Sequence, residues 1–134
     1  QAAILRVKLR HIEAWNAARR DVASWYDELL AGHKSIRLPR VRAEAEHVFH
    51  LYVVQVEERD RIRQYLNDNG IGAGVHYPVP LHEQPALAYL GMKPEDLPVT
   101  SKLGQTVLSL PIFPEMTRAQ AERVAATFVD AVDA

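Results

Sequence analysis

The first third of the chain carries an unbroken helical pattern of apolar residues. Between Ala2 and Ala31 there is no glycine or proline, and apolar side chains recur at steps of three and four. They are Leu5, Leu9, Ile12, Trp15, Ala18, Val22, Trp25 and Leu29. This period is typical of an amphipathic helix, which at 1.5 Å per residue would be about 45 Å long. Because that exceeds the width of a compact domain of this size, we expect another domain or subunit to cover part of the stripe. Trp15 and Trp25 should therefore be only partly buried within this chain.

The rest of the pattern alternates short strands with helices. Residues 35–39 predict a short edge strand, residues 47–56 the strongest strand, and residues 71–75 another short strand. Residues 58–70 predict a helix, and residues 98–109 a helix that runs into a strand. Thr117 and Gln120 form a capping box that opens a last helix. We therefore expect an α+β fold, in which helices pack against a small mixed or antiparallel sheet and a long helix leads in from the N-terminus.

Composition narrows the class of protein. Residues 1–42 carry nine Lys and Arg against four Asp and Glu, a net charge of +5, and the remainder carries −6. We interpret the basic part as a solvated helix face, since no DNA-binding or RNA-binding pattern accompanies it, and expect no nucleic-acid partner. No apolar run reaches the length of a membrane span, so no membrane partner is expected. The chain has no cysteine, which excludes disulfides and thiolate catalysis and suits a cytoplasmic protein.

The segment from Gly70 to Gly91, GIGAGVHYPVPLHEQPALAYLG, has the most unusual composition in the chain. A phosphate loop is disfavoured, because its glycines would have to follow a strand and precede a helix, and here the order is reversed. A zinc site is also disfavoured. HEQPA begins like the H-E-x-x-H helix, but Ala86 takes the place of the second histidine and Pro85 would break the helix. His47 and His50, three apart in a predicted strand, would point to opposite faces, so we expect no metal site.

The motif HYPVPLH within this segment leaves two interpretations open. Pro78 and Pro80 hold the backbone extended, so a stiff loop could present His76, Tyr77 and His82 to a polar ligand. Alternatively, the loop is structural and its Tyr and His side chains bond to backbone groups. Composition alone supports both equally.

No catalytic set is recognisable in the chain by itself. There is no Gly-x-Ser-x-Gly motif, and the four lysines are Lys8, Lys34, Lys93 and Lys102. None of them lies in an apolar stretch that would desolvate its amine for covalent chemistry. We therefore predict no catalytic residue in this chain.

Three stretches resemble the C-terminal part of the DegT/StrS-type aminotransferases. They are LRVKLRHIEAWNAARR, GIGAGVHYPVPLHEQPAL and LSLPIFPEMT, and together they cover nearly the whole chain in matching order. These enzymes use pyridoxal phosphate, have fold type I architecture and act on keto sugars attached to nucleotides. The resemblance implies that residues 1–31 are a connector helix and residues 32–134 the small C-terminal domain. A large domain carrying the Schiff-base lysine and most of the cofactor site would precede them. By the same resemblance His76 and Tyr77 face the sugar or its pyrophosphate, and His82 is a weaker match.

The resemblance also implies a reaction and partners. The intact enzyme would move an amino group, from glutamate, to a keto sugar nucleotide, and would be a homodimer with active sites at the subunit interface. This segment would help form the sugar-nucleotide pocket and the dimer, and would be inactive alone. Two alternatives stay open: a free-standing, non-catalytic binding module, and a related pyridoxal-phosphate sugar dehydratase. In dehydratases of this kind histidine replaces the Schiff-base lysine, at a position outside this chain.

Overall fold

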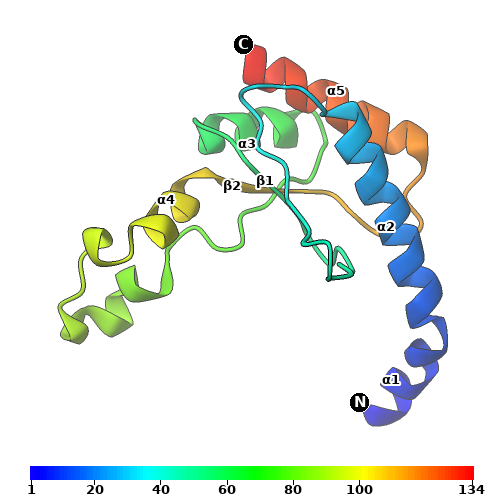
Figure 1. The fold of residues 1–134 in the computed structure, drawn as a ribbon, viewed down its shortest axis with the longest axis horizontal. Coiled ribbons are helices and arrows are strands. Elements are labelled where there is room, and N and C mark those ends of the chain that lie inside the picture. The colour runs from blue at the N-terminus through cyan, green and yellow to red at the C-terminus, as the bar shows by residue number, and fades with distance from the viewer.

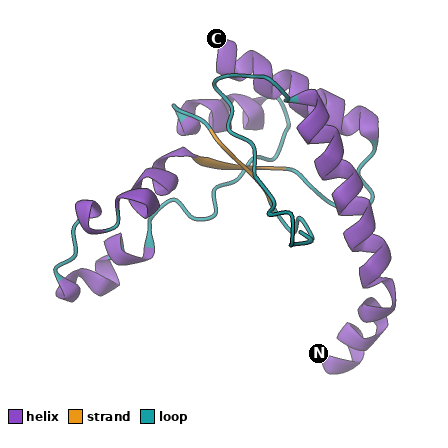
Figure 2. Cartoon of the chain, viewed as in Figure 1, coloured by secondary structure: helices purple, strands orange, loops and turns teal.

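A short antiparallel sheet forms the centre of the molecule. The computed structural model describes residues 1–134, in which strand β1 (Tyr52–Gln55) pairs with strand β2 (Val107–Leu110). Tyr52 lies opposite Leu110 and Gln55 opposite Val107. The two strands cross at the centre of the view, with helices on several sides (Figures 1 and 2). The predicted α+β class, with a small antiparallel sheet, is confirmed.

Three helices and the sheet enclose one core. Helix α2 (Ile12–Leu29) packs against α5 (Arg118–Asp133), which also packs against α3 (Arg59–Asp68). Tyr26, Tyr52 and Phe128 are the largest fully buried side chains, and the rings of the two tyrosines lie 5.0 Å apart. Their hydroxyls are satisfied, because Tyr26 donates to the carbonyl of Pro111 and Tyr52 donates to Asp27. Burial raises the pKa of both phenols well above the usual range.

The N-terminal helix is long but not uniform. The predicted long N-terminal helix is confirmed: helix α1 (Ala2–Lys8) continues into α2 through a single 3-10 turn, η1 (Leu9–His11). No residue of α1 is buried, whereas the C-terminal half of α2 contributes to the core. The exposed apolar side chains at this end are Ile4, Leu5, Val7 and Leu9. Trp15 and Trp25 are both half-buried, as predicted. A division of the chain at residue 31 stays a prediction.

The strands are shorter than the sequence indicated. The predicted strand 47–56 is limited to β1, because Phe49 adopts a positive φ of 46° and its amide donates to His47 Nδ1. The argument that placed His47 and His50 on opposite strand faces is therefore wrong. Residues 35–39 and 71–75 are not strands either. Each adds one bridge, Arg37 to Gln55 and Gly74 to Ser109, at the two edges of the sheet.

The predicted ends of two helices are confirmed. Gly70, with a φ of 73°, follows the end of α3, where a left-handed conformation favours glycine. At the start of α5 the Thr117 hydroxyl accepts from the amide of Gln120, and the Gln120 side chain accepts from the amide of Thr117. None of the helices combines the length and the apolar character that a membrane span requires.

Candidate functional site

Two consecutive segments extend from the sheet and enclose the candidate site. Residues 76–81, here called the wall, lead away from the edge of β2. Residues 82–106, here called the arm, contain the 3-10 helices η2 (Leu81–Glu83, which begins at the last wall residue), η3 (Pro85–Leu90) and η4 (Pro94–Asp96), followed by α4 (Pro98–Thr106). In Figure 1 the arm projects from the body of the molecule on the side opposite α1 and α2. The wall and α4 line a cavity of about 590 Å³.

His76 is held at the edge of the sheet. The backbone groups of Gly74 and Ser109 exchange hydrogen bonds of 3.1 and 2.8 Å, which bring the wall against β2. There the Nδ1 of His76 lies 2.9 Å from the Ser109 hydroxyl, and no hydrogen bond within the chain uses its Nε2. A Cβ atom on Gly74 would lie 3.1 Å from the His76 ring, so glycine makes room for the imidazole at this position. The arrangement fixes the ring and leaves Nε2 for a ligand.

Tyr77 stands beside His76 and is open to solvent. Its side chain is 76% exposed, and its ring meets the His76 ring edge-on at 5.8 Å. The hydroxyl makes no hydrogen bond within the chain. Both residues line the cavity of about 590 Å³, so the structure brings them together.

His82, the third residue singled out by the sequence, has a different environment. It is only 6% exposed and lines neither of the cavities that contain His76. Its Nε2 lies 3.2 Å from the Ser101 hydroxyl and 3.3 Å from the Glu83 carboxylate. The prediction that it contacts substrate is untested, but its burial places it behind the wall.

Two residues at the site had no signal in the sequence. His50 and Ser109 line a second cavity, of about 250 Å³, together with His76. Ser109 is 33 residues from His76 and His50 is 26 residues away, so only the fold brings them together. A local motif search has no access to such contacts.

A buried arginine fixes the junction between α4 and β2. Arg59 of α3 is 6% exposed, and its guanidinium donates to the carbonyls of Gly104 and Val107, each at 3.1 Å. Its Nε pairs with Asp60 at 2.9 Å. A Cβ atom on Gly104 would lie 2.8 Å from Pro80, so the wall touches the helix backbone at this point. The position of the wall therefore depends on that of α4.

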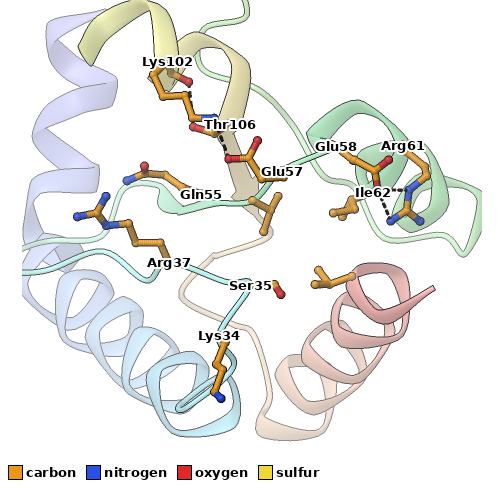
Figure 3. Close-up of a pocket in the computed structure, with 12 residues that line it drawn as sticks. Lys34, Ser35, Arg37, Gln55, Glu57, Glu58, Arg61, Ile62, Lys102 and Thr106 are labelled. Atoms are coloured by element: carbon orange, nitrogen blue, oxygen red, sulfur yellow. Dashed lines mark hydrogen bonds and ion pairs between the residues drawn. The ribbon is translucent and has the colours of Figure 1, made fainter. Parts of the chain in front are cut away.

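A separate groove of about 470 Å³ lies between β1, α3 and α4 (Figure 3). Its charges are largely matched within the chain, since Lys102 bonds Glu57 at 2.8 Å and Arg61 bonds Glu58 at 3.1 Å. The side chains of Lys34 and Arg37 point in different directions rather than to one point (Figure 3). With no convergent polar groups, this groove is a weaker candidate for a ligand site than the cavity at His76. No cluster of three potential metal ligands occurs in the structure.

The lysines do not fit covalent attachment of a cofactor. Lys8, Lys34, Lys93 and Lys102 are all exposed, and Lys102 is engaged with Glu57. An amine that forms a Schiff base is normally desolvated or placed beside another cation. The chain therefore supplies a wall with polar groups, and the absence of an attachment site stays a prediction.

Comparison with known proteins defines the class. The sequence profile of the DegT/DnrJ/EryC1/StrS aminotransferase family matches residues 1–129. The chain belongs to this family. It is 44% identical, over 95% of its length, to the erythromycin biosynthesis sensory transduction protein EryC1 of Saccharopolyspora erythraea. It is 42% identical, over 98% of its length, to a dTDP-3-amino-3,4,6-trideoxy-alpha-D-glucose transaminase of Streptomyces venezuelae.

A solved structure agrees with this assignment. S. venezuelae DesV superposes on the whole chain with a TM-score of 0.95 at 39% identity, and the chain covers 36% of that protein. The chain covers 35% and 34% of the two curated relatives, so it spans about a third of their length.

Proposed function

We propose that this chain is the C-terminal part of a longer aminotransferase that moves an amino group, from glutamate, to a keto sugar nucleotide. The observation that carries the proposal is the cavity where His76 and Tyr77 meet, within a chain of this family. The S. venezuelae relative is named as a transaminase of a dTDP-linked amino sugar, which supports a nucleotide sugar as the substrate class.

His76 and Tyr77 bind and orient the sugar nucleotide in this proposal. Ser109 fixes the His76 ring, so that Nε2 can bond a sugar hydroxyl or, as a donor, a phosphate oxygen. The Tyr77 hydroxyl can donate to or accept from a second polar group. Such contacts align the keto carbon for amino transfer without taking part in the chemistry.

Pyridoxal phosphate supplies the electron sink of the reaction when it is bound, and the rest of the enzyme would hold it. The exposed lysines of this chain do not fit its attachment, so we assign no chemical step to them. The role left to the chain is to shape the substrate side of the cleft and to exclude water from it.

We also propose that the exposed apolar surfaces are contacts in a homodimer. On the arm, Tyr89 is 80% exposed and Val99 72% exposed, and Leu90, next to Tyr89 in sequence, is also exposed. Isolated surface apolar residues are normal, whereas larger exposed apolar patches are typical of an interface. The arm would meet the second subunit, and α1 the remainder of its own chain.

With no cysteine in the chain, we propose the cytoplasm as the location.

The first prediction is that the isolated chain is not labelled at any one lysine by pyridoxal phosphate. Incubation with the cofactor, reduction with borohydride and peptide mapping should give only scattered, substoichiometric modification, because all four lysines are exposed. Labelling of one lysine at one equivalent per chain would show that an attachment site lies in this segment after all.

The second prediction tests the proposed function through Tyr77→Phe in the full-length enzyme. The change removes one hydroxyl and keeps the ring, so it isolates a hydrogen bond of about 0.5–1.5 kcal/mol, or about 2- to 12-fold in kcat/KM. Single-turnover kinetics should show this loss with the keto sugar nucleotide, and an unchanged half-reaction with glutamate. Equal losses in both half-reactions, with a lower Tm, would mean that the wall is only structural. A wild-type enzyme that transfers no amino group to any keto sugar nucleotide would refute the function itself.

A further inference from the structure

A polar cluster joins the base of the arm to α4, behind the wall. The Ser101 hydroxyl lies 2.5 Å from Glu83 Oε1 and 3.1 Å from the carbonyl of Pro94. The Nε2 of His82 lies 3.2 Å from the same hydroxyl and 3.3 Å from Glu83 Oε1. His82 is 6% exposed and Ser101 is 9% exposed, so the cluster is enclosed by the chain. It links η2 and η4 to the first turns of α4.

The hydrogen-bond pattern assigns the protons in this cluster. A serine hydroxyl has one hydrogen, and an ionised carboxylate only accepts, so Ser101 donates to Glu83, the shorter contact, and not to the Pro94 carbonyl. The contact between Ser101 and His82 then requires that His82 donates from Nε2 to the Ser101 oxygen. The other ring nitrogen, Nδ1, is buried and has no partner. Because the unsatisfied Nδ1 lowers the stability of the fold, a histidine that only fills space would be disfavoured here. We therefore attribute the presence of histidine at position 82 to the contact that its Nε2 makes.

The location of the cluster connects it to the candidate site. His82 follows the wall directly, and Ser101 lies one turn of α4 before Gly104, against which Pro80 packs. The wall is thus fixed by Ser109 at His76 and by Gly104 at Pro80, and Ser101 fixes His82 and Glu83, the arm residues that follow it. Loss of the His82 contact would leave only the Glu83 bond to Ser101 and so loosen the arm side of the wall, while its sheet side stays attached.

We infer that His82 is a positioning residue, which holds the wall so that His76 and Tyr77 meet the sugar nucleotide in one geometry. It acts from within the arm through Ser101 and touches no substrate. The inference rests on the proposed function for its effect on substrate, whereas the anchoring of the wall is a property of this chain alone.

The test compares three variants of the full-length enzyme. His82→Leu removes the donor and keeps apolar bulk, and His82→Gln keeps an N–H group near the position of Nε2. Thr106→Val is the matched control, because it removes another buried α4 hydroxyl, whose bond stays within the helix to the Lys102 carbonyl. In His82→Leu we expect amide hydrogen exchange at Glu83 and Gln84, whose amides bond the carbonyls of Pro80 and Leu81 in the wall, to rise about 10-fold, as for the loss of one hydrogen bond. We expect KM for the sugar nucleotide to rise about 10- to 100-fold, as for a small misplacement of the wall. The glutamate half-reaction should stay unchanged, His82→Gln should recover most of the loss, and Thr106→Val should change neither readout.

Each outcome decides the inference. Unchanged exchange at Glu83 and Gln84 in His82→Leu, or equal effects of His82→Leu and Thr106→Val, would overturn it. Nitrogen NMR of the wild type should show the proton of His82 on Nε2, and a proton on Nδ1 alone would overturn the assignment. If His82→Leu does not fold, Ser101→Ala, which removes the acceptor of His82 together with the donor to Glu83 and keeps the ring, is measured in the same way. If the wild type proves inactive with sugar nucleotides, the proposed function fails, and the exchange data still decide whether His82 anchors the wall.

Discussion

Gly104→Ala is expected to lower kcat/KM for the sugar nucleotide by about 100-fold, as for a misplacement of the wall by about 1 Å. The added Cβ would lie 2.8 and 2.9 Å from two ring carbons of Pro80, closer than carbon atoms approach in proteins. The helix cannot withdraw easily, because Arg59 bonds the carbonyl of Gly104. The Pro80 ring is stiff, so the wall has to move. Stopped-flow measurement of the two half-reactions should place the loss with the sugar nucleotide alone.

The stability of this variant should change much less than its activity. Alanine is about 1 kcal/mol better than glycine in a helix, which partly offsets about 1–3 kcal/mol of overpacking. The matched control is Gln105→Ala, at an exposed position of the same helix, and it should be neutral. Wild-type kinetics in Gly104→Ala would show that Pro80 yields without moving the wall.

His76→Ala is expected to have the second large effect, a loss of about 10- to 150-fold in kcat/KM for the sugar nucleotide. This range corresponds to one hydrogen bond to a charged group, about 1.5–3 kcal/mol, which is the bond that Nε2 would make to a phosphate oxygen. The glutamate half-reaction should stay near the wild-type rate, since the small amino donor needs no contact with the wall.

Two further variants make this result specific. Ser109→Ala should give a smaller loss than His76→Ala, because the imidazole remains and only its orientation is loosened. His47→Ala changes an exposed histidine that lines neither cavity at the site, and it should leave sugar turnover unchanged. If His47→Ala and His76→Ala behaved alike, the imidazole at position 76 would have no part in binding.

The helices were predictable from sequence because their signals are local. Apolar spacing, the Thr117 capping box and the stop at Gly70 all act within a few residues, and α3, α4 and α5 appear where those signals place them. Strand lengths were not predictable in the same way. Residues 71–75 have strand-like composition, but the amide of Ala73 donates to the Asn67 side chain. It is therefore not available for pairing with a neighbouring strand. A β-propensity pattern does not account for hydrogen bonds from the backbone to a side chain, which compete with pairing between strands.

The candidate site was predictable only in part, for a similar reason. The motif HYPVPLH located the wall, because two prolines and adjacent donors are a local feature. It could not separate exposed Tyr77 from buried His82, since the burial of His82 depends on Ser101, 19 residues later. Nor could it identify Ser109 as the partner of His76. Contacts between distant segments decide which histidine is presented and which is enclosed.

The buried guanidinium of Arg59 limits how the cleft could open and close. Its two bonds tie α3 to the carbonyls at both sides of the α4–β2 junction, so a relative movement of these elements would cost both bonds. A rocking motion of the arm about that junction would have to break both bonds and leave a desolvated cation. The hinge is therefore expected nearer the tip, among the turns that follow Leu90, where a left-handed Gly91 can absorb changes in φ and ψ. Substrate entry would then involve bending of the outer arm, while the segment beside the sheet stays in place.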